Sequence, residues 1–200
     1  MIKPVLAIDI DEVLFPFTDL FLAYHNEKHG TNIALSDMQT NYLEDITGDT
    51  LEQILVKLED FANTEAFRQN RPLQHSVESL EKLRQHYELV LVTARDHFYR
   101  GHTERFIEGH YPNVFRELHY THQIETPHER EKKWVMCQRL NAVALIDDTL
   151  KNVVQCAEHG IDGIVFGDYP WNQADELPPG VTRCKDWPAV LEYFGRQRNA

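Results

Sequence analysis

The stretch VLAIDIDEVL, residues 5–14, joins four consecutive apolar residues to two aspartates that lie two positions apart, Asp9 and Asp11. A short apolar run without polar alternation is typical of a strand covered on both faces, as in a parallel sheet. Two like charges beside a buried strand cost free energy unless another group compensates them. The stretch therefore predicts a strand of a parallel sheet and requires a partner for its two carboxylates.

Three more apolar runs predict further strands of the same sheet. They are LVLV at 89–92, VALI at 143–146 and IVF at 164–166, and a fifth, less regular strand is expected at 114–118. Helical patterns separate these runs, and strands that alternate with helices predict an α/β fold with a doubly wound, Rossmann-like parallel sheet. The expected helices cover residues 77–86, 99–110, 129–140, 149–159 and 186–197.

Residues 16–74 do not fit this alternation. They contain helical patterns at 17–30 and 49–62, with Asp49 as the expected N-cap of the second helix. A crossover between parallel strands needs only about a dozen residues. The surplus predicts a small helical cap, residues 16–74, inserted after the first strand of a core formed by residues 1–15 and 75–200.

The acidic composition limits the classes of partner. The formal net charge is −12, from 20 Lys and Arg against 32 Asp and Glu. Such a surface repels a phosphodiester backbone unless basic residues gather in one place, and the dense basic run REKK at 130–133 is interrupted by a glutamate. We therefore expect no long nucleic acid as a partner, whereas a small anionic substrate remains compatible with a locally positive site.

Three features of the sequence favour a cytoplasmic location. No apolar stretch approaches the roughly 20 residues that span a bilayer, so no membrane partner is expected. The N-terminus lacks the apolar region and small-residue cleavage site of a signal peptide. Cys137, Cys156 and Cys184 lack the spacing of metal ligands and are interpreted as reduced thiols. The oligomeric state is left open.

Eleven histidines are many for this length, and five of them lie between His102 and His128. A metal cluster and a solvent-exposed histidine-rich region both explain them. The second interpretation is favoured, because neither an HExxH motif nor zinc-ligand spacing is present.

Polar residues follow three of the predicted strands at the point where each strand ends. They are Asp9, Thr93 and Asp147, with Asp11 and Asp148 close by. Ligands of open parallel sheets bind outside the carboxyl ends of the strands, so these side chains are expected in one crevice. Each residue alone is a weak signal, since Asp148 could equally cap the helix that follows it. Their common position predicts a site with four carboxylates.

Four carboxylates cannot bind a phosphate dianion without cations. Mg²⁺ prefers carboxylate, water and phosphate oxygens, and a lysine can supply a further positive charge. The segment EREKKWVMCQRL at 129–140 offers Lys132 and Lys133. The sequence therefore predicts that a phosphate could bind at this crevice only together with Mg²⁺ and a lysine.

The motifs DIDEV (9–13), LVTAR (91–95), Lys133 and LIDD (145–148) together resemble the four motifs of the haloacid dehalogenase-like (HAD) phosphohydrolase superfamily. The insertion after the first motif matches the C1 cap position of that superfamily. VLFPFTDLF (13–21) and the segment 148–173 are similar to its 5′(3′)-deoxyribonucleotidase-like branch.

This resemblance implies the roles of the site residues. Asp9 would be the nucleophile that forms an aspartyl-phosphate, and Asp11 the general acid and then the general base. Thr93 and the backbone N–H of Ala94 would hold phosphate oxygens. Lys133, preferred over Lys132 by its spacing to Asp147 in similar sequences, would screen charge. The expected Mg²⁺ ligands are the Asp9 carboxylate, the Asp11 backbone carbonyl and the Asp147–Asp148 pair.

The resemblance also bears on the substrate. Dehalogenases of the superfamily lack an acid/base aspartate two residues after the nucleophile, so Asp11 favours phosphoryl transfer. Aromatic cap residues of the nucleotidase branch stack on the base, and Phe17 occupies such a position, with Arg95 and Tyr42 as further candidate substrate ligands. Alternatively, Phe15, Phe17 and Phe21 form the apolar face of the first cap helix.

The expected enzyme is a Mg²⁺-dependent phosphomonoesterase for nucleoside (deoxy)monophosphates. A phosphatase for another small metabolite, such as a sugar phosphate, is the alternative. A non-catalytic protein of this fold is disfavoured by the complete motif set, and a phosphatase for nucleic-acid ends is disfavoured by the charge.

Overall fold

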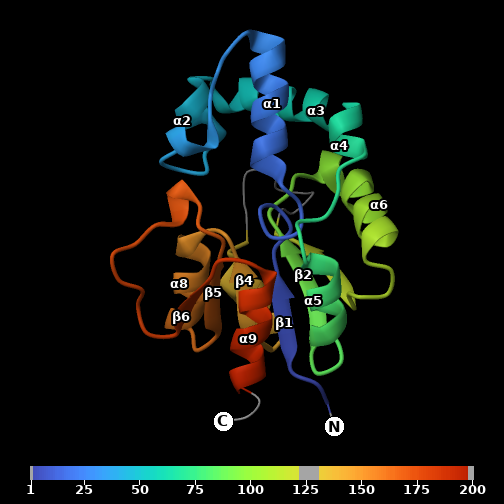
Figure 1. The fold of residues 1–200 in the computed structure, drawn as a ribbon, viewed down its shortest axis with the longest axis vertical. Helices are drawn as coiled ribbons and strands as arrows, with labels where there is room; N and C mark the ends of the chain where they lie inside the picture. Colours follow the sequence, from blue (N-terminus) through green and yellow to red (C-terminus); the bar gives the residue numbers. More distant parts are fainter. Residues whose placement is uncertain (1, 122–130, 198–200) are drawn as a thin grey trace.

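The computed structural model describes residues 2–121 and 131–197, and its centre is one parallel sheet with helices on both faces (Figure 1). The strand order is β3-β2-β1-β4-β5-β6, and every neighbouring pair is parallel. The strands are β1 (Val5–Ile8), β2 (Glu88–Thr93), β3 (Glu117–Tyr120), β4 (Ala142–Asp147), β5 (Asp162–Phe166) and β6 (Val181–Cys184). The doubly wound α/β prediction is confirmed.

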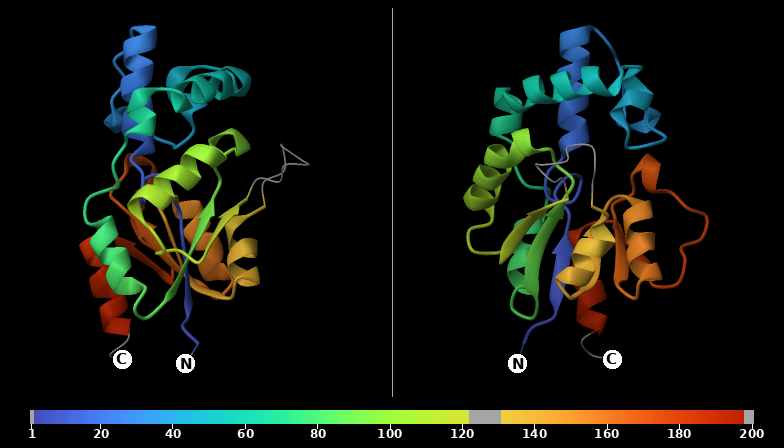
Figure 2. Two further views of the ribbon diagram at one scale, coloured as in Figure 1. Left: turned by 90° about the vertical axis from the view of Figure 1, so that its right-hand side faces the viewer. Right: turned by 180° about the vertical axis from the view of Figure 1, so that it is seen from behind.

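The four apolar runs form the centre of this sheet because both of its faces are covered. Leu6 and Ile8 pack into one hydrophobic cluster, and Val5 and Ala7 pack into another on the opposite face. The first cluster includes residues of the helices α5 (Ser76–Leu83), α6 (Arg100–His110) and α9 (Trp187–Gln197). The second includes residues of α7 (Lys133–Arg139) and α8 (Leu150–Glu158). Both helices lie in front of the sheet in the view from behind (Figure 2).

Two strand predictions need correction. The fifth strand was expected at 114–118, but β3 begins at Glu117, because Val114 belongs to a turn in which its N–H donates to the carbonyl of Tyr111. Strand β6 was not expected at all. Its sequence VTRC buries only its first and last residues, since it lies at the edge of the sheet and is covered incompletely.

The segment 17–68, which follows β1, lies at the end of the molecule above the carboxyl ends of the strands, whereas α5 lies beside the sheet (Figure 1). It contains α1 (Phe17–His29), α2 (Leu43–Thr47), α3 (Leu51–Ala62) and α4 (Glu65–Arg68). The expected helices at 17–30 and 49–62 correspond to α1 and α3. That residues 16–74 form a separate unit, with core and cap dividing after residues 15 and 74, stays a prediction.

The start of α3 differs from the expectation. Thr50, not Asp49, is the N-cap: its hydroxyl accepts from the Gln53 N–H at 3.3 Å, and the Gln53 side chain accepts from the Thr50 N–H at 2.8 Å. Asp49 pairs instead with Lys57 at 2.6 Å.

The remaining helices follow the sequence pattern within a few residues. The helix expected at 129–140 is α7, which begins at Lys133. Residues 129 and 130 lie outside the described residues. Within the described ranges, no helix combines the length and the apolar character needed to cross a bilayer.

Candidate active site

The site lies where the central strands end. Asp9 directly follows β1, Thr93 ends β2 and Asp147 ends β4, and β1 pairs with both of the other strands. The Asp9 N–H donates to the carbonyl of Ile146 at 2.9 Å, which ties the two strand ends together. The chain runs from β1 to β2 on one side and from β4 to β5 on the other, so the strand order reverses between β1 and β4. Ligands of open α/β sheets bind at such a point.

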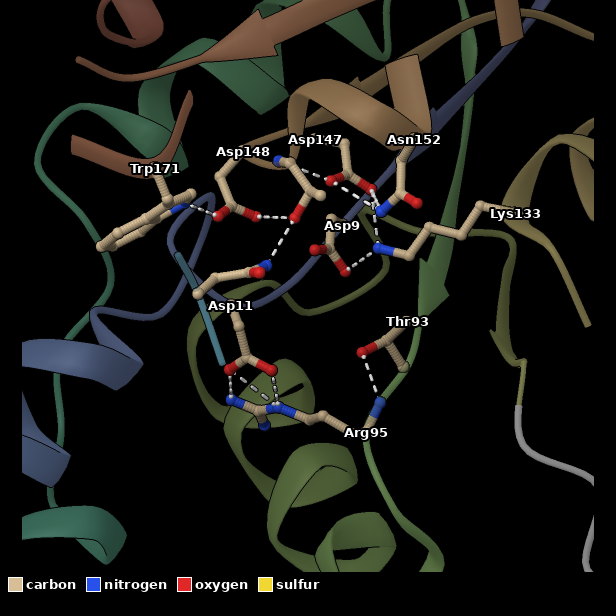
Figure 3. A network of polar contacts seen from close by, with 11 residues as sticks. Asp9, Asp11, Thr93, Arg95, Lys133, Asp147, Asp148, Asn152 and Trp171 are labelled. Atoms are coloured by element: carbon tan, nitrogen blue, oxygen red, sulfur yellow. Dashed lines mark hydrogen bonds and ion pairs between the residues drawn. The ribbon is translucent and has the colours of Figure 1, made fainter. Parts of the chain in front are cut away.

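Three carboxylates meet there inside the protein (Figure 3). Asp9, Asp147 and Asp148 are 6%, 0% and 5% exposed, and each offers an oxygen within 4.8 Å of the others. Among the described residues this is the only such group of potential metal ligands, so the described histidines form none. An all-oxygen donor set of this charge fits Mg²⁺.

Lys133 bridges two of these carboxylates. Its ammonium lies 2.8 Å from Asp9 Oδ1 and 2.7 Å from Asp147 Oδ2, and the side chain is 6% exposed. Lys132 is exposed and precedes α7 as its N-cap. The structure therefore brings Lys133, rather than Lys132, into contact with the acidic group.

The buried charges shift each other's protonation. Burial raises the pKa of Asp9 to about 7, against the lowering effect of Lys133 and with a further raising effect of Asp147. Burial and the charges of Asp147 and Asp9 also raise the pKa of Asp148 well above its usual value. Burial alone would lower the pKa of Lys133, but the carboxylates of Asp147 and Asp9 raise it. The group as it stands is short of positive charge, which a divalent cation would supply.

The two neighbouring aspartates differ in their partners. Asp147 Oδ1 accepts from the Thr149 N–H at 2.8 Å, and both of its oxygens accept from Asn152 Nδ2 at 3.1 and 3.2 Å. Asp148 Oδ2 accepts from Trp171 Nε1 at 2.7 Å, whereas its Oδ1 has a long contact of 3.5 Å with the Thr149 hydroxyl. Asp148 consequently has the oxygen that is freer to bind a metal, and it does not cap α8.

Asp11 lies outside the buried group of three carboxylates, although it lines the same crevice as Asp9 and Asp148. Its side chain is 30% exposed and forms a forked ion pair with Arg95, in which Nη2 lies 2.6 Å from Oδ1 (Figure 3). The Arg95 N–H donates to the buried Thr93 hydroxyl at 3.2 Å. The side chains of Asp9 and Asp11 therefore have different environments despite their short separation in sequence.

A crevice of about 450 Å³ lies between these residues and the helices above the strand ends. Asp9, Asp11, Ala94, Lys133 and Asp148 line it from the strand ends and the segments that follow them, and Phe17 of α1 and Tyr42, just before α2, line it from the other side. The volume suits a small ligand.

The sequence left two roles open for Phe17, stacking on the base of a substrate or packing in the apolar face of a helix, and the structure is compatible with both. Phe17 lies parallel to Phe21 with ring centres 6.3 Å apart, and it meets Phe61, Phe67 and Tyr99 edge to face. It is thus part of an aromatic cluster and also borders the crevice. Phe15 is 1% exposed and lies away from the crevice lining.

Several residues at the site escaped the sequence analysis, and three of them show why. Glu12 has a φ of 60°, and its carboxylate accepts from the Thr18 N–H in the first turn of α1 at 2.6 Å; burial raises its pKa to about 8. Asn41, between α1 and α2, donates to the Thr149 hydroxyl at 3.0 Å. The third is Trp171. Glu12 lies 6 residues from its partner, Asn41 lies 108 from its partner, and Trp171 lies 23 from Asp148, so no local sequence pattern reveals these contacts.

Comparisons with known proteins agree on one family. The model of the family described as "5' nucleotidase, deoxy (Pyrimidine), cytosolic type C protein" matches residues 3–197. YqfW of Bacillus subtilis, provisionally named a nucleotidase, is 26% identical over 198 residues, which are 97% of this chain and 95% of that protein.

Solved structures share the fold. A haloacid dehalogenase-like family hydrolase from Streptococcus pneumoniae has a TM-score of 0.71 at 17% identity, covering 96% of this chain and 98% of its own. YfnB of Bacillus subtilis, provisionally named a HAD hydrolase and solved with bound magnesium, has a TM-score of 0.62 at 11% identity and covers 96% and 99%. At these identities the likeness concerns the fold alone.

Proposed function

Since the chain belongs to the 5′ nucleotidase, deoxy (pyrimidine), cytosolic type C family, we propose that it dephosphorylates nucleoside (deoxy)monophosphates through an aspartyl-phosphate at Asp9, with Mg²⁺ as cofactor. Its enzyme class, a phosphoric monoester hydrolase of the HAD superfamily, follows from the family and is supported by the similarity to YqfW. The observation that carries the proposal is the buried Asp9, bridged by Lys133 to Asp147 beside Asp148, in a crevice that also contains Asp11.

In the first half of the reaction, an oxygen of Asp9 attacks phosphorus and the ester P–O bond breaks. Lys133 holds Asp9 Oδ1 at 2.8 Å, which fixes the orientation of the carboxylate and offsets negative charge as the phosphoryl group arrives. Asp11 borders the same crevice; its carboxylate, paired with Arg95 in the ligand-free protein, takes up a solvent proton beside the bound phosphate anion and donates it to the departing alcohol oxygen. The products are the nucleoside and phosphorylated Asp9.

In the second half, water attacks the phosphorus of the aspartyl-phosphate. Asp11, deprotonated in the first half, accepts a proton from this water, and the P–O bond to Asp9 breaks. Inorganic phosphate leaves, and both aspartates return to their initial states. The Thr93 hydroxyl and the Ala94 N–H are the proposed ligands of the phosphate oxygens.

The metal ligands we propose are the Asp9 carboxylate, Asp148 Oδ1 and the Asp11 backbone carbonyl. Asp147 is assigned a supporting role, because Lys133, Thr149 and Asn152 already occupy its oxygens. When bound, Mg²⁺ would neutralise the carboxylates and the phosphate charge.

The nucleotide preference rests on the family and on Phe17, whose ring borders the crevice as part of the aromatic cluster. A stacked base gains on the order of 1–3 kcal/mol from such a ring. We also propose a cytoplasmic location, in keeping with the three buried, free thiols Cys137, Cys156 and Cys184.

The test is a panel of nucleoside 5′- and 3′-monophosphates and sugar phosphates, assayed for phosphate release with Mg²⁺ and with EDTA. We expect Mg²⁺-dependent turnover with nucleotides preferred. A flat profile or a preference for sugar phosphates would reject the nucleotide assignment. Asp9→Asn should abolish turnover with the fold retained, whereas the exposed control Asp175→Asn should match the wild type.

A further inference from the structure

The guanidinium group of Arg95 is engaged on all three nitrogens within the protein. Nε lies 3.1 Å from both carboxylate oxygens of Asp11, and Nη2 lies 2.6 Å from Oδ1. Nη1 donates to the Thr103 hydroxyl at 2.9 Å, and the side chain is only 1% exposed. Arg95 borders the crevice, but its nitrogens are already occupied by Asp11 and Thr103, so its charge faces the Asp11 carboxylate.

Neighbouring groups hold this guanidinium in one orientation. Its central carbon lies 4.4 Å from the ring centre of Phe15, and 5.8 Å from those of Phe67 and Tyr99. Thr103, which accepts from Nη1, itself donates to the carbonyl of Tyr99 at 3.0 Å. Three aromatic rings and the Thr103 hydroxyl thus fix the orientation of the guanidinium group toward Asp11.

Among the hydrogen bonds of the described residues, those that reach the Asp11 carboxylate all come from Arg95. Asp11 follows the end of β1, its side chain is 30% exposed at the crevice, and the carboxylate of Asp9 nearby carries the same charge. A freely rotating carboxylate would spend much of its time away from the reacting oxygen. Displacement of a reacting group by about 1 Å costs on the order of 100-fold in rate.

We propose that Arg95 is a positioning residue that holds the Asp11 carboxylate for proton transfer, and that it is not a ligand of the substrate phosphate. This inference rests on the proposed function of Asp11 and changes the role expected for Arg95 from the sequence. The two roles differ kinetically: a phosphate ligand affects the binding of every phosphomonoester, whereas a residue that positions a proton donor affects bond cleavage according to the leaving group.

The test measures release of the alcohol in the first turnover by Arg95→Met, with a nucleoside monophosphate and with p-nitrophenyl phosphate. Nitrophenolate departs without a proton, whereas a nucleoside alkoxide requires one. We expect a loss of about 100-fold with the nucleotide, less than tenfold with the nitrophenyl ester, and KM values within about threefold of the wild type. Arg105→Met, an exposed position on the same helix α6 as Thr103, is the control and should match the wild type.

Two further variants keep the inference testable if Arg95→Met folds poorly. Arg95→Lys retains the charge without the fork and should stay impaired on the nucleotide. Thr103→Val removes the acceptor of Nη1 without touching Asp11 and should show the same leaving-group pattern at smaller amplitude. An equal loss on both esters, or a raised KM with unchanged alcohol release, would overturn the positioning role. A wild type that hydrolyses no phosphomonoester would instead overturn the proposed function itself, and this inference with it.

Discussion

The indole Nε1 of Trp171 donates a hydrogen bond to Oδ2 of Asp148 across 2.7 Å. The next residue, Asn172, donates from Nδ2 to the backbone carbonyl of Asp148 at 2.9 Å. Two consecutive residues after β5 therefore fix both the side chain and the backbone of one candidate metal ligand. This arrangement directs the second oxygen of Asp148 to the acidic group, as the outer partners of metal ligands commonly do.

Trp171→Phe is expected to weaken Mg²⁺ binding by about 10–100-fold, because phenylalanine keeps the stacking on Tyr169 but cannot donate to Asp148. Calorimetric titration of the substrate-free protein with Mg²⁺ measures the change. Trp134→Phe is the matched control, since Trp134 stacks on His159. An unchanged Mg²⁺ affinity in Trp171→Phe would contradict the assignment of Asp148 as a ligand.

Lys133→Met should abolish turnover, whereas Lys132→Met should retain most of it, because only Lys133 neutralises Asp9 and Asp147. Without its ammonium, two buried carboxylates lose their partner, which costs about 3–5 kcal/mol of unfolding free energy in EDTA. Denaturant unfolding of both variants measures this cost. Equal effects of the two substitutions would mean that the ion pairs to Lys133 are not important.

The pH dependence of stability should reveal the buried Glu12. Its folded-state pKa of about 8 lies above the ordinary value of 4.5, so the native state binds more protons between these values. Its contribution to stability is therefore fully present below about pH 4.5 and is lost as the pH rises through 8. Asp9, with a pKa raised to about 7, acts in the same direction.

Glu12→Gln removes this ionisation and keeps an oxygen to accept from the Thr18 N–H. The free energy of unfolding of the variant, relative to that of the wild type, should increase as the pH rises from 5 to 8.5, by on the order of 2–4 kcal/mol at pH 8.5. Unfolding curves in EDTA at both pH values provide the comparison. A difference between variant and wild type that does not change with pH would show that Glu12 ionises normally in the native state.

Phe17→Leu should raise KM for a nucleoside monophosphate by about tenfold or more relative to p-nitrophenyl phosphate, because stacking on the base is lost. Phe21→Leu controls for packing, since Phe21 belongs to the same aromatic cluster but does not line the crevice. If both variants change both substrates alike, Phe17 serves only as part of the apolar face of α1.

The strands at the centre of the sheet could be predicted because burial on both faces leaves continuous apolar runs such as VLAI and VALI. The same reasoning placed Asp9, Thr93 and Asp147 at one edge of the sheet, since carboxyl ends of neighbouring parallel strands meet there; of the three, only Asp9 lines the crevice. The edge strand β6 could not be predicted, because half-covered residues leave no continuous run.

Some site contacts depend on separations that no local pattern encodes. Arg95 and Asp11 lie 84 residues apart, and a substrate ligand and an ion-pair partner look identical in sequence. Lys132 and Lys133 are adjacent, so only the start and rotation of α7 decide which ammonium reaches the buried carboxylates.

By itself, the sequence determined the parallel sheet, the acidic strand ends and their need for cations, because residue burial and charge are local properties. Only the tertiary structure decided how the carboxylates divide: Asp9, Asp147 and Asp148 together in the interior, and Asp11 apart on Arg95. The physical reason is that a carboxylate's environment is set by groups that folding brings to it from distant strands and helices.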